Sequence, residues 1–364
     1  MKTLTLTLAL WSCIMTSARA AEIPVYLATP SKDQGGIYLA QLDTDSGKLS
    51  EPQRLTESQS SFVSLHPSKK FLYAVGEDKV RGFAIDQASK KLTPLNDQPS
   101  GGRGPCYVAV DPEGKNTLIA NYSGGTISVV PIKPDGSLGD PTAVIEHKGA
   151  GPNPKRQEKP HPHSVNLDPT GKLVLAADLG LDQIKLYRLD APAGTLSPAD
   201  PPHVPTPPGG GPRHSDFHPT GKFLYVNNEM GCSVTAYAYD GAGNFKELQT
   251  ITTLTRPATD ADTTSEIQVH PSGKFLYVAN RGPNDIASFS IDESTGKLSD
   301  IGHTPTEGKT PRHFAIDPTG KWLLVANQND DKVVVLKIDE KTGALSPTGN
   351  AVTLDQPMCV LFYP

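Results

Sequence analysis

The sequence predicts an all-β fold, a seven-bladed β-propeller with four strands in each blade. The first observation is a sequence motif that occurs six times: an apolar residue, His or Asp, Pro, any residue, Gly and Lys. In the first copy Lys69 replaces the Gly. Successive prolines lie 45, 57, 50, 52 and 47 residues apart, which is the period of propeller blades. The second observation is the alternation of apolar and polar residues after each copy, as in 286–292, which is typical of β-strands.

The repeated phrase predicts the turn between the first two strands of each blade. Its Pro fixes one turn φ, and its Gly supplies a positive φ. The apolar run that follows, such as 223–226, predicts the second strand, and a Thr-Gly-x-Leu motif closes several units. His66, His218 and His270 stand where other copies have Asp. We therefore expect these three histidines to be turn residues.

The two chain ends are expected to complete the ring. Residues 25–28 and 36–43 predict two strands with no first strand before them, whereas 357–362 predicts a first strand with nothing after it. A shared seventh blade would leave only short, protected sheet edges.

Residues 1–20 predict a signal peptide, and residues 21–364 the propeller domain. Lys2 precedes a short apolar run, and Ala18-Arg19-Ala20 matches a cleavage site before Ala21. The mature protein is then expected in the periplasm or secreted. A lipoprotein signal at 10–13 fits less well because Trp11 stands where a small residue is wanted. The apolar run is too short for a membrane anchor.

The net charge argues against nucleic acid as a partner, and the cysteine spacing argues against a metal site. The net charge is −5, and loss of Lys2 and Arg19 with the signal peptide makes it −7, which argues against nucleic acid as a partner. Cys106, Cys232 and Cys359 remain, without metal-site spacing. We expect free thiols, because a Cys106–Cys359 bridge would need adjacent blades and one blade is counted between them. No metal or cofactor is predicted, and the oligomeric state is left open.

A candidate site follows from the repeat geometry. The start of a blade's first strand and the end of its second lie together, opposite the turn, so both face one mouth of the channel. Six residues before the repeat prolines stand Ser61, Cys106, His163, Arg213, Ser265 and Arg312, with Met358 as the C-terminal counterpart. Ten residues after them stand Glu77, Tyr122, Leu179, Glu229, Arg281 and Gln328. Converging charges predict an anion-binding reaction site; a solvated rim with structural salt bridges is the alternative.

One insertion stands out beside this ring. The Pro-rich segment 149–164 ends at His163 and is long enough to cover the channel mouth as a lid. His163 does not follow the turn-histidine pattern, whereas His161 is either a supporting group or a loop residue.

Several motifs resemble the seven-bladed propeller lactonases. They are Gly-Pro-Asn-Pro-x-Arg-Gln-x-x-Pro-His-x-His-Ser-Val at 151–165, Gly-Pro-Arg-His at 211–214, Val-Asn-Asn-Glu at 226–229, Val-Ala-Asn-Arg at 278–281 and Pro-Arg-His at 311–313. That family includes the propeller-type 6-phosphogluconolactonases and, more distantly, carboxy-muconate lactonising enzymes. The resemblance implies a lactone opened, or in the muconate branch closed, by His163, Arg213 and Glu229, with Arg281 binding an anion.

These residues define an expected mechanism of lactone hydrolysis. His163 has the right ordinary pKa for a general base, Arg213 can stabilise an oxyanion, and Glu229 either orients these groups or acts as an acid. Arg281 and Arg312 are expected to bind a phosphate or carboxylate, and His214, Gln328 and Glu266 complete the predicted substrate-binding set.

Three functions remain open on the sequence alone: a lactone hydrolase, a ligand-binding propeller without turnover, and a lactonising cycloisomerase of the muconate type. Export would favour sugar lactones without phosphate as substrates. Because the site is expected at a rim, loss of His163 or Arg213 should remove activity at little cost in stability.

Overall fold

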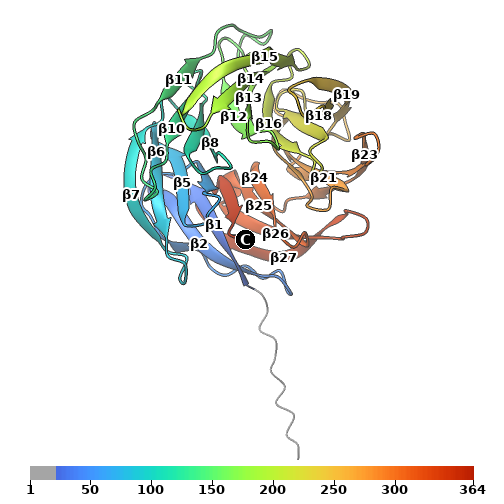
Figure 1. Ribbon diagram of the computed structural model, residues 1–364. Coiled ribbons are helices and arrows are strands. Elements are labelled where there is room, and N and C mark those ends of the chain that lie inside the picture. The colour runs from blue at the N-terminus through green and yellow to red at the C-terminus, as the bar shows by residue number, and fades with distance from the viewer. Residues whose placement is uncertain (1–21) are drawn as a thin grey trace, which may run out of the picture.

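The computed structural model describes residues 22–364 as a ring of seven antiparallel sheets with four strands each (Figure 1). The seven-bladed propeller and the shared blade are thereby confirmed. The expected signal peptide lies outside the described residues. Blades are numbered 1 to 7 here along the chain, with the blade of the two chain ends as blade 7.

Blades 1 to 3 follow one another in sequence. Blade 1 contains β4 (Phe62–Leu65), β5 (Phe71–Gly76), β6 (Lys79–Ile85) and β7 (Leu92–Pro99). Blade 2 contains β8 (Pro105–Val110), β9 (Asn116–Asn121), β10 (Thr126–Pro131) and β11 (Ala143–Glu146). Blade 3 contains β12 (Pro162–Leu167), β13 (Leu173–Asp178), β14 (Gln183–Asp190) and β15 (Thr195–Pro205).

The remaining blades close the ring. Blade 4 contains β16 (Pro212–Phe217), β17 (Phe223–Asn228), β18 (Ser233–Tyr239) and β19 (Phe245–Thr252). Blade 5 contains β20 (Thr263–Val269), β21 (Phe275–Arg281), β22 (Asp285–Ile291) and β23 (Leu298–Pro305). Blade 6 contains β24 (Pro311–Ile316), β25 (Trp322–Asn327), the short 3₁₀ turn η1 (Gln328–Asp330), β26 (Lys332–Ile338) and β27 (Leu345–Thr353). Blade 7 is ordered β28 (Cys359–Phe362), β1 (Glu22–Thr29), β2 (Gly36–Asp43) and β3 (Gln53–Arg54).

The turn histidines connect neighbouring blades. His218 Nδ1 lies 2.8 Å from Thr220 Oγ1 in its own turn, and Nε2 lies 2.9 Å from the carbonyl oxygen of Gly273 in the next blade. Gly273 has φ +76°, and a Cβ there would lie 2.6 Å from that imidazole. The position therefore needs glycine both for its backbone conformation and for the close approach. His66 and His270 make equivalent contacts, so the turn assignment is confirmed.

The hydrophobic core is divided among the blade interfaces. Seven clusters of buried apolar residues occur in residues 22–364, and each joins two adjacent blades. Tyr225 shows how such an interface is fixed, because its ring is buried and its hydroxyl donates to the Gly296 carbonyl of the next blade at 3.0 Å. Since each blade packs on its neighbours, an open ring would leave two blade faces without a packing partner.

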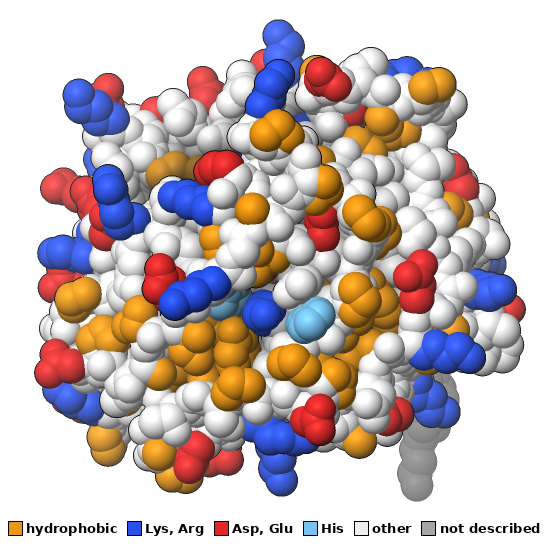
Figure 2. Space-filling view, turned by 90° about the horizontal axis from the view of Figure 1, so that it is seen from above, with side chains coloured by type: hydrophobic (Ala, Val, Ile, Leu, Met, Phe, Trp, Pro, Cys, Tyr) orange, Lys and Arg blue, Asp and Glu red, His pale blue; other side chains and the backbone are white. Residues whose placement is uncertain are grey.

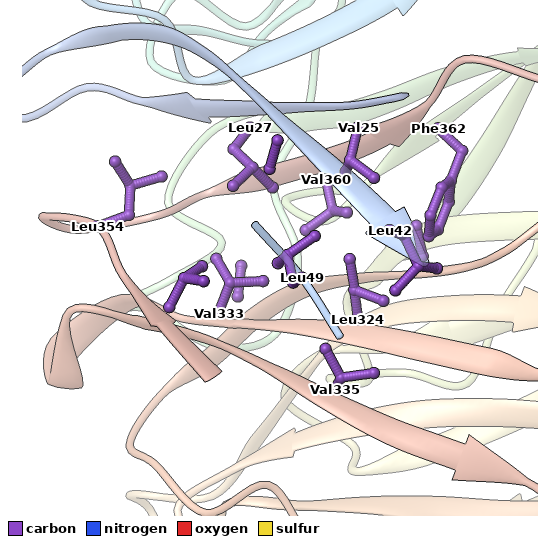
Figure 3. Packing of buried hydrophobic residues seen from close by; sticks show 14 of the residues in the cluster. Val25, Leu27, Leu42, Leu49, Leu324, Val333, Val335, Leu354, Val360 and Phe362 are labelled. Atoms are coloured by element: carbon purple, nitrogen blue, oxygen red, sulfur yellow. The ribbon is translucent and has the colours of Figure 1, made fainter. Parts of the chain in front are cut away.

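The chain ends provide that closure. β28 pairs antiparallel with β1 from Val25↔Phe362 to Ala28↔Cys359. Figure 3 shows Val360 and Phe362 beside Val25, within the cluster that also holds Leu324 and Val333 of blade 6. The last strand therefore supplies both a sheet partner and part of a core.

Deletion of residues 357–364 is expected to give insoluble or poorly folded protein, because it removes the inner strand of blade 7 and exposes the edge of β1. Soluble yield and thermal unfolding check this. Removal of Pro364 alone is the control and should cost little, because β28 ends at Phe362. A 357–364 deletion that melts like the wild type would contradict the role of β28 in closure.

The outer surface mixes charges of both signs, as the face in Figure 2 shows. None of the helices within residues 22–364 is long and apolar enough to cross a membrane. Cys106, Cys232 and Cys359 are free thiols, as expected.

Candidate active site

The candidate site is built on irregular starts of the inner strands. In blades 2 to 6 the pairing of the first strand with the second shifts by one residue at the channel mouth. In blade 3, for example, Pro162 pairs with Asp178 and Ser164 with Ala177, which leaves His163 as the extra residue. Such bulges turn a side chain away from the regular alternation and are frequent beside active sites. They occur at the ring positions singled out in the sequence.

A cavity of about 410 Å³ lies at this mouth. Four of the predicted site residues line it, namely His163, Glu229, Arg281 and Arg312. A narrower recess shares His163 and Arg312 with the cavity and is lined by Arg213 and His214. The structure therefore gathers the three predicted catalytic residues and both predicted anion-binding arginines in one place.

Glu229 is the common partner of three arginines. It follows β17 directly, and its Oε1 lies 2.6 Å from Arg156 Nη2. Its Oε2 lies 2.9 Å from Arg213 Nε and 3.1 Å from Arg281 Nη2. Burial alone would raise the pKa of this carboxyl, but the charges of Arg281 and Arg213 outweigh it and hold the pKa well below the ordinary value. Glu229 is therefore ionised.

Arg312 carries the free positive charge of the site. Its guanidinium has no hydrogen bond or ion pair with any residue in 22–364, although it lines both the cavity and the recess. Burial and the nearby Arg281 lower its pKa, which is the electrostatic signature of cations held close together. Four arginines face a single carboxylate, so the site suits an anionic group on a ligand or a negative charge that develops during reaction.

His163 is held as a neutral imidazole. Its ring packs edge-on against Tyr122 and His214, with centroids 5.4 and 5.1 Å away. Burial and the charge of Arg213 keep its pKa well below the ordinary value. Its nearest sulfur is that of Cys106, 3.9 Å from Nδ1, and burial raises the pKa of this thiol to about 11. The histidine can accept a proton, whereas the cysteine is not an ionised nucleophile.

Arg213 lies deeper than the sequence suggested. Arg213 is only 2% exposed, and its Nη1 donates to the Ser265 carbonyl oxygen. The expectation that Arg213→Ala would cost little stability is therefore wrong, because the change removes a buried partner of Glu229.

Three predicted substrate-binding residues lie apart from the cavity. Gln328 begins η1 and is not among the residues that line the cavity. His214 lines only the recess. Glu266 lines two cavities of about 340 and 390 Å³. The turn residues Pro169 and Pro318 also line these cavities, so they open at the opposite end of the channel.

Arg156 is the main site residue that was not predicted. It comes from the Pro-rich insertion. Asp178 holds both the chain just before this insertion and its later part: His147 Nδ1 lies 2.6 Å from Asp178 Oδ2, and the His161 amide donates to Oδ1 at 2.8 Å. Gln157 anchors the middle through a 2.6 Å bond to Asp182. The insertion thus brings Arg156 to the cavity. The only sequence signal was its place within the motif at 151–165.

Comparison with known proteins shows the family of the chain. The family model described as lactonase, 7-bladed beta-propeller, matches residues 24–362. The chain belongs to this family.

Individual relatives cover most of the chain. The 6-phosphogluconolactonase of Bacillus subtilis is 37% identical over 290 residues, 78% of this chain and 82% of the relative. Among solved structures, a putative 6-phosphogluconolactonase from Bacteroides fragilis is 34% identical, with a TM-score of 0.87 over 97% of this chain and all of that one. A periplasmic gluconolactonase of Pseudomonas aeruginosa is 29% identical, with a TM-score of 0.90 over 94% of this chain and 99% of the other. These similarities support a lactone hydrolase.

Proposed function

We propose that this lactonase hydrolyses a sugar-derived lactone to its hydroxy acid in the 410 Å³ cavity, with His163 as general base. The observation that carries the proposal is a neutral histidine beside an unpaired arginine in a pocket with excess positive charge. Hydrolysis needs a proton acceptor for water and a cation for the carbonyl oxygen, and the pocket supplies both.

The reaction proceeds through one tetrahedral intermediate. His163 accepts a proton from water as the water oxygen attacks the lactone carbonyl carbon. The carbonyl oxygen becomes negative and is stabilised by Arg312, which lines the cavity, and by the charge of Arg213 in the adjoining recess. The carbon–oxygen bond of the ring then breaks, its electron pair goes to the ring oxygen, and that oxygen takes the proton back from His163. The carboxylic acid product loses its proton to solvent.

Glu229 is assigned an orienting role rather than that of an acid. An acid must carry a proton to donate, and the three arginines keep this carboxylate ionised. By bridging Arg156 on the insertion to Arg213 and Arg281 on blades 4 and 5, it fixes cations that repel one another.

The substrate is tested by initial rates on glucono-δ-lactone, 6-phosphogluconolactone and a carboxy-muconate, each corrected for its spontaneous reaction. We expect hydrolysis of the sugar lactones, and because of the predicted export we expect the unphosphorylated lactone to be used with the higher kcat/KM. Formation of a lactone from the muconate would favour the cycloisomerase instead. Acceleration of none of the three would contradict the proposal.

Location in the periplasm or outside the cell is part of the proposal. The N-terminal pattern supports it, as does the likeness to a periplasmic gluconolactonase. Expression with the native N-terminus should yield mature protein that begins at or near Ala21, as measured by intact mass and N-terminal sequencing. Soluble protein that retains Met1 would contradict export and favour the phosphorylated substrate.

A further inference from the structure

A groove of about 890 Å³ adjoins the candidate active site and is larger than the 410 Å³ cavity itself. Arg156 and Thr263 line both spaces, so the groove lies directly beside the cavity. His163 and Arg312 line the cavity alone, which places the groove away from the reacting groups. The cavity already has room for the single ring of a simple sugar lactone. A substrate of that size would leave the groove unused.

Two segments line the groove, and buried contacts hold both in place. One is the part of the insertion at 152–156, which is anchored through Gln157 as described above. The other is the stretch 258–263 at the end of the connection from β19 to β20. There the buried Asp262 carboxylate accepts from both Nη atoms of Arg256, at 2.7 and 2.9 Å. A preformed groove loses little conformational freedom when a ligand binds.

Arg156 connects the groove to the cavity. Its Nη2 contacts Glu229 Oε1 at 2.6 Å and the Tyr122 hydroxyl oxygen at 3.3 Å. Its Nε and Nη1 have no hydrogen-bond partner among residues 22–364, and the side chain is 39% exposed. The guanidinium therefore keeps donors for a ligand that extends across both spaces.

The chemistry of the groove suits an uncharged group that carries hydroxyls. Lys155 and Asp260 are exposed, have opposite charges and have no side-chain partner within the described part of the chain. The Asn153 side-chain amide donates only to the Met230 sulfur, a weak acceptor, at 3.7 Å. Met230 and Pro208 offer apolar surface to the carbon atoms of a sugar ring. A phosphate would instead meet the carboxylate of Asp260.

We propose that the groove is a subsite for a second sugar unit, and that the preferred substrate is the δ-lactone of a disaccharide acid. The lactone ring occupies the cavity, and the glycosyl unit, attached to a hydroxyl remote from the carbonyl, occupies the groove. The inference rests on the proposed function, because the lactone ring reacts at the same His163. Contacts with the non-reacting unit increase kcat/KM, since binding energy from remote parts of a substrate helps to position the reacting part.

The test compares kcat/KM for glucono-δ-lactone, 6-phosphogluconolactone and the δ-lactones of cellobionic, maltobionic and melibionic acid, each corrected for spontaneous opening. The last three carry the second sugar through a 4-linkage of either anomeric form or through a 6-linkage. At least one of them should exceed glucono-δ-lactone by about 10-fold or more in kcat/KM, from a few added hydrogen bonds. The inference is overturned if none of the three exceeds it. An enzyme inactive on every lactone would refute the proposed function instead.

Ala258→Leu tests the groove directly. Ala258 is an exposed groove residue that the mechanism does not use, so the larger side chain narrows the groove without entering the core. This variant should lose about 10-fold in kcat/KM on the preferred disaccharide lactone and change by less than about 2-fold on glucono-δ-lactone. Ala242→Leu is the matched control, because Ala242 is an equally exposed alanine in the turn between β18 and β19 and does not line the groove. It should leave both rates unchanged.

Asp260→Ala is a second variant that does not depend on the first. It removes one acceptor of the groove, so KM for the disaccharide lactone should rise about 3-fold or more while KM for glucono-δ-lactone stays the same. Equal effects of Ala258→Leu or Asp260→Ala on both lactones would overturn the subsite. A loss confined to 6-phosphogluconolactone would assign the groove to a phosphate and would overturn it as well.

Discussion

His163→Ala is expected to lose about 10²- to 10⁴-fold in the rate of lactone hydrolysis, the range that a general base contributes. The expected loss lies in kcat, because the imidazole acts on water rather than holding the lactone. The melting temperature should fall less than in Arg213→Ala, since no ion pair within residues 22–364 involves His163, but some loss is expected because the imidazole is buried and packs on Tyr122 and His214. Steady-state kinetics and thermal unfolding of the purified variant measure both.

His218→Asn is the control for that variant. His218 lies in a turn at the far end of its blade and contacts Gly273 rather than the cavity. This change should retain activity. Normal turnover in His163→Ala would remove the histidine from the mechanism, and an equal loss in His218→Asn would show that the site lies at the other mouth.

Glu229→Gln is expected to be both inactive and strongly destabilised. Its carboxylate is 4% exposed and is the shared partner of Arg156, Arg213 and Arg281. Removing one partner of a buried ion pair typically costs about 3–5 kcal/mol, and here the remaining arginines would also repel one another. Chemical denaturation at pH 7 measures the loss.

The pH dependence of that loss has a definite sign. The pKa of Glu229 in the folded protein lies below its ordinary 4.5, so its stabilisation is complete above about pH 4.5 and is lost as pH falls. The deficit of Glu229→Gln should therefore be full at pH 7 and shrink in acid.

Glu77→Gln provides the matched comparison for Glu229→Gln. Glu77 stands at the same position of the repeat, ten residues after the repeat proline, but pairs with one arginine and is 49% exposed. Such a pair contributes about 1 kcal/mol or less. Equal destabilisation by both changes would mean that burial of the Glu229 cluster is not what stabilises it.

The sequence predicted the ring of blades, but it did not predict how deeply the side chains of the site are buried. Periodic Pro-x-Gly-Lys turns specify the blades locally, and the strand count at the chain ends specifies closure, because each depends on short segments. The bulge at the start of an inner strand depends on how that strand pairs with the second strand of its blade. It turns Arg213 toward Glu229 and the next residue, His214, toward Glu266, and no residue pattern marks that difference.

Contacts between segments that are distant in sequence account for the other differences between the predicted and the observed site. Arg156 reaches Glu229 of blade 4 from an insertion that Asp178 and Asp182 anchor on blade 3. Glu266 is a residue type that often binds ligands. It nevertheless faces the opposite end of the channel and contacts His214, because the pairing of β20 with β21 has its own bulge. A sequence position near the mouth therefore predicted the neighbourhood of these residues but not the end of the channel that each one faces.

A crystal structure of the mature protein with gluconate bound would test the central claim most directly, that lactone chemistry takes place at the mouth that holds His163. The account predicts the product carboxylate within hydrogen-bonding distance of Arg213 or Arg312, and the hydroxyl that was the ring oxygen beside His163. Gluconate bound instead in the cavities next to Glu266 and Tyr107, at the other end of the channel, would contradict it.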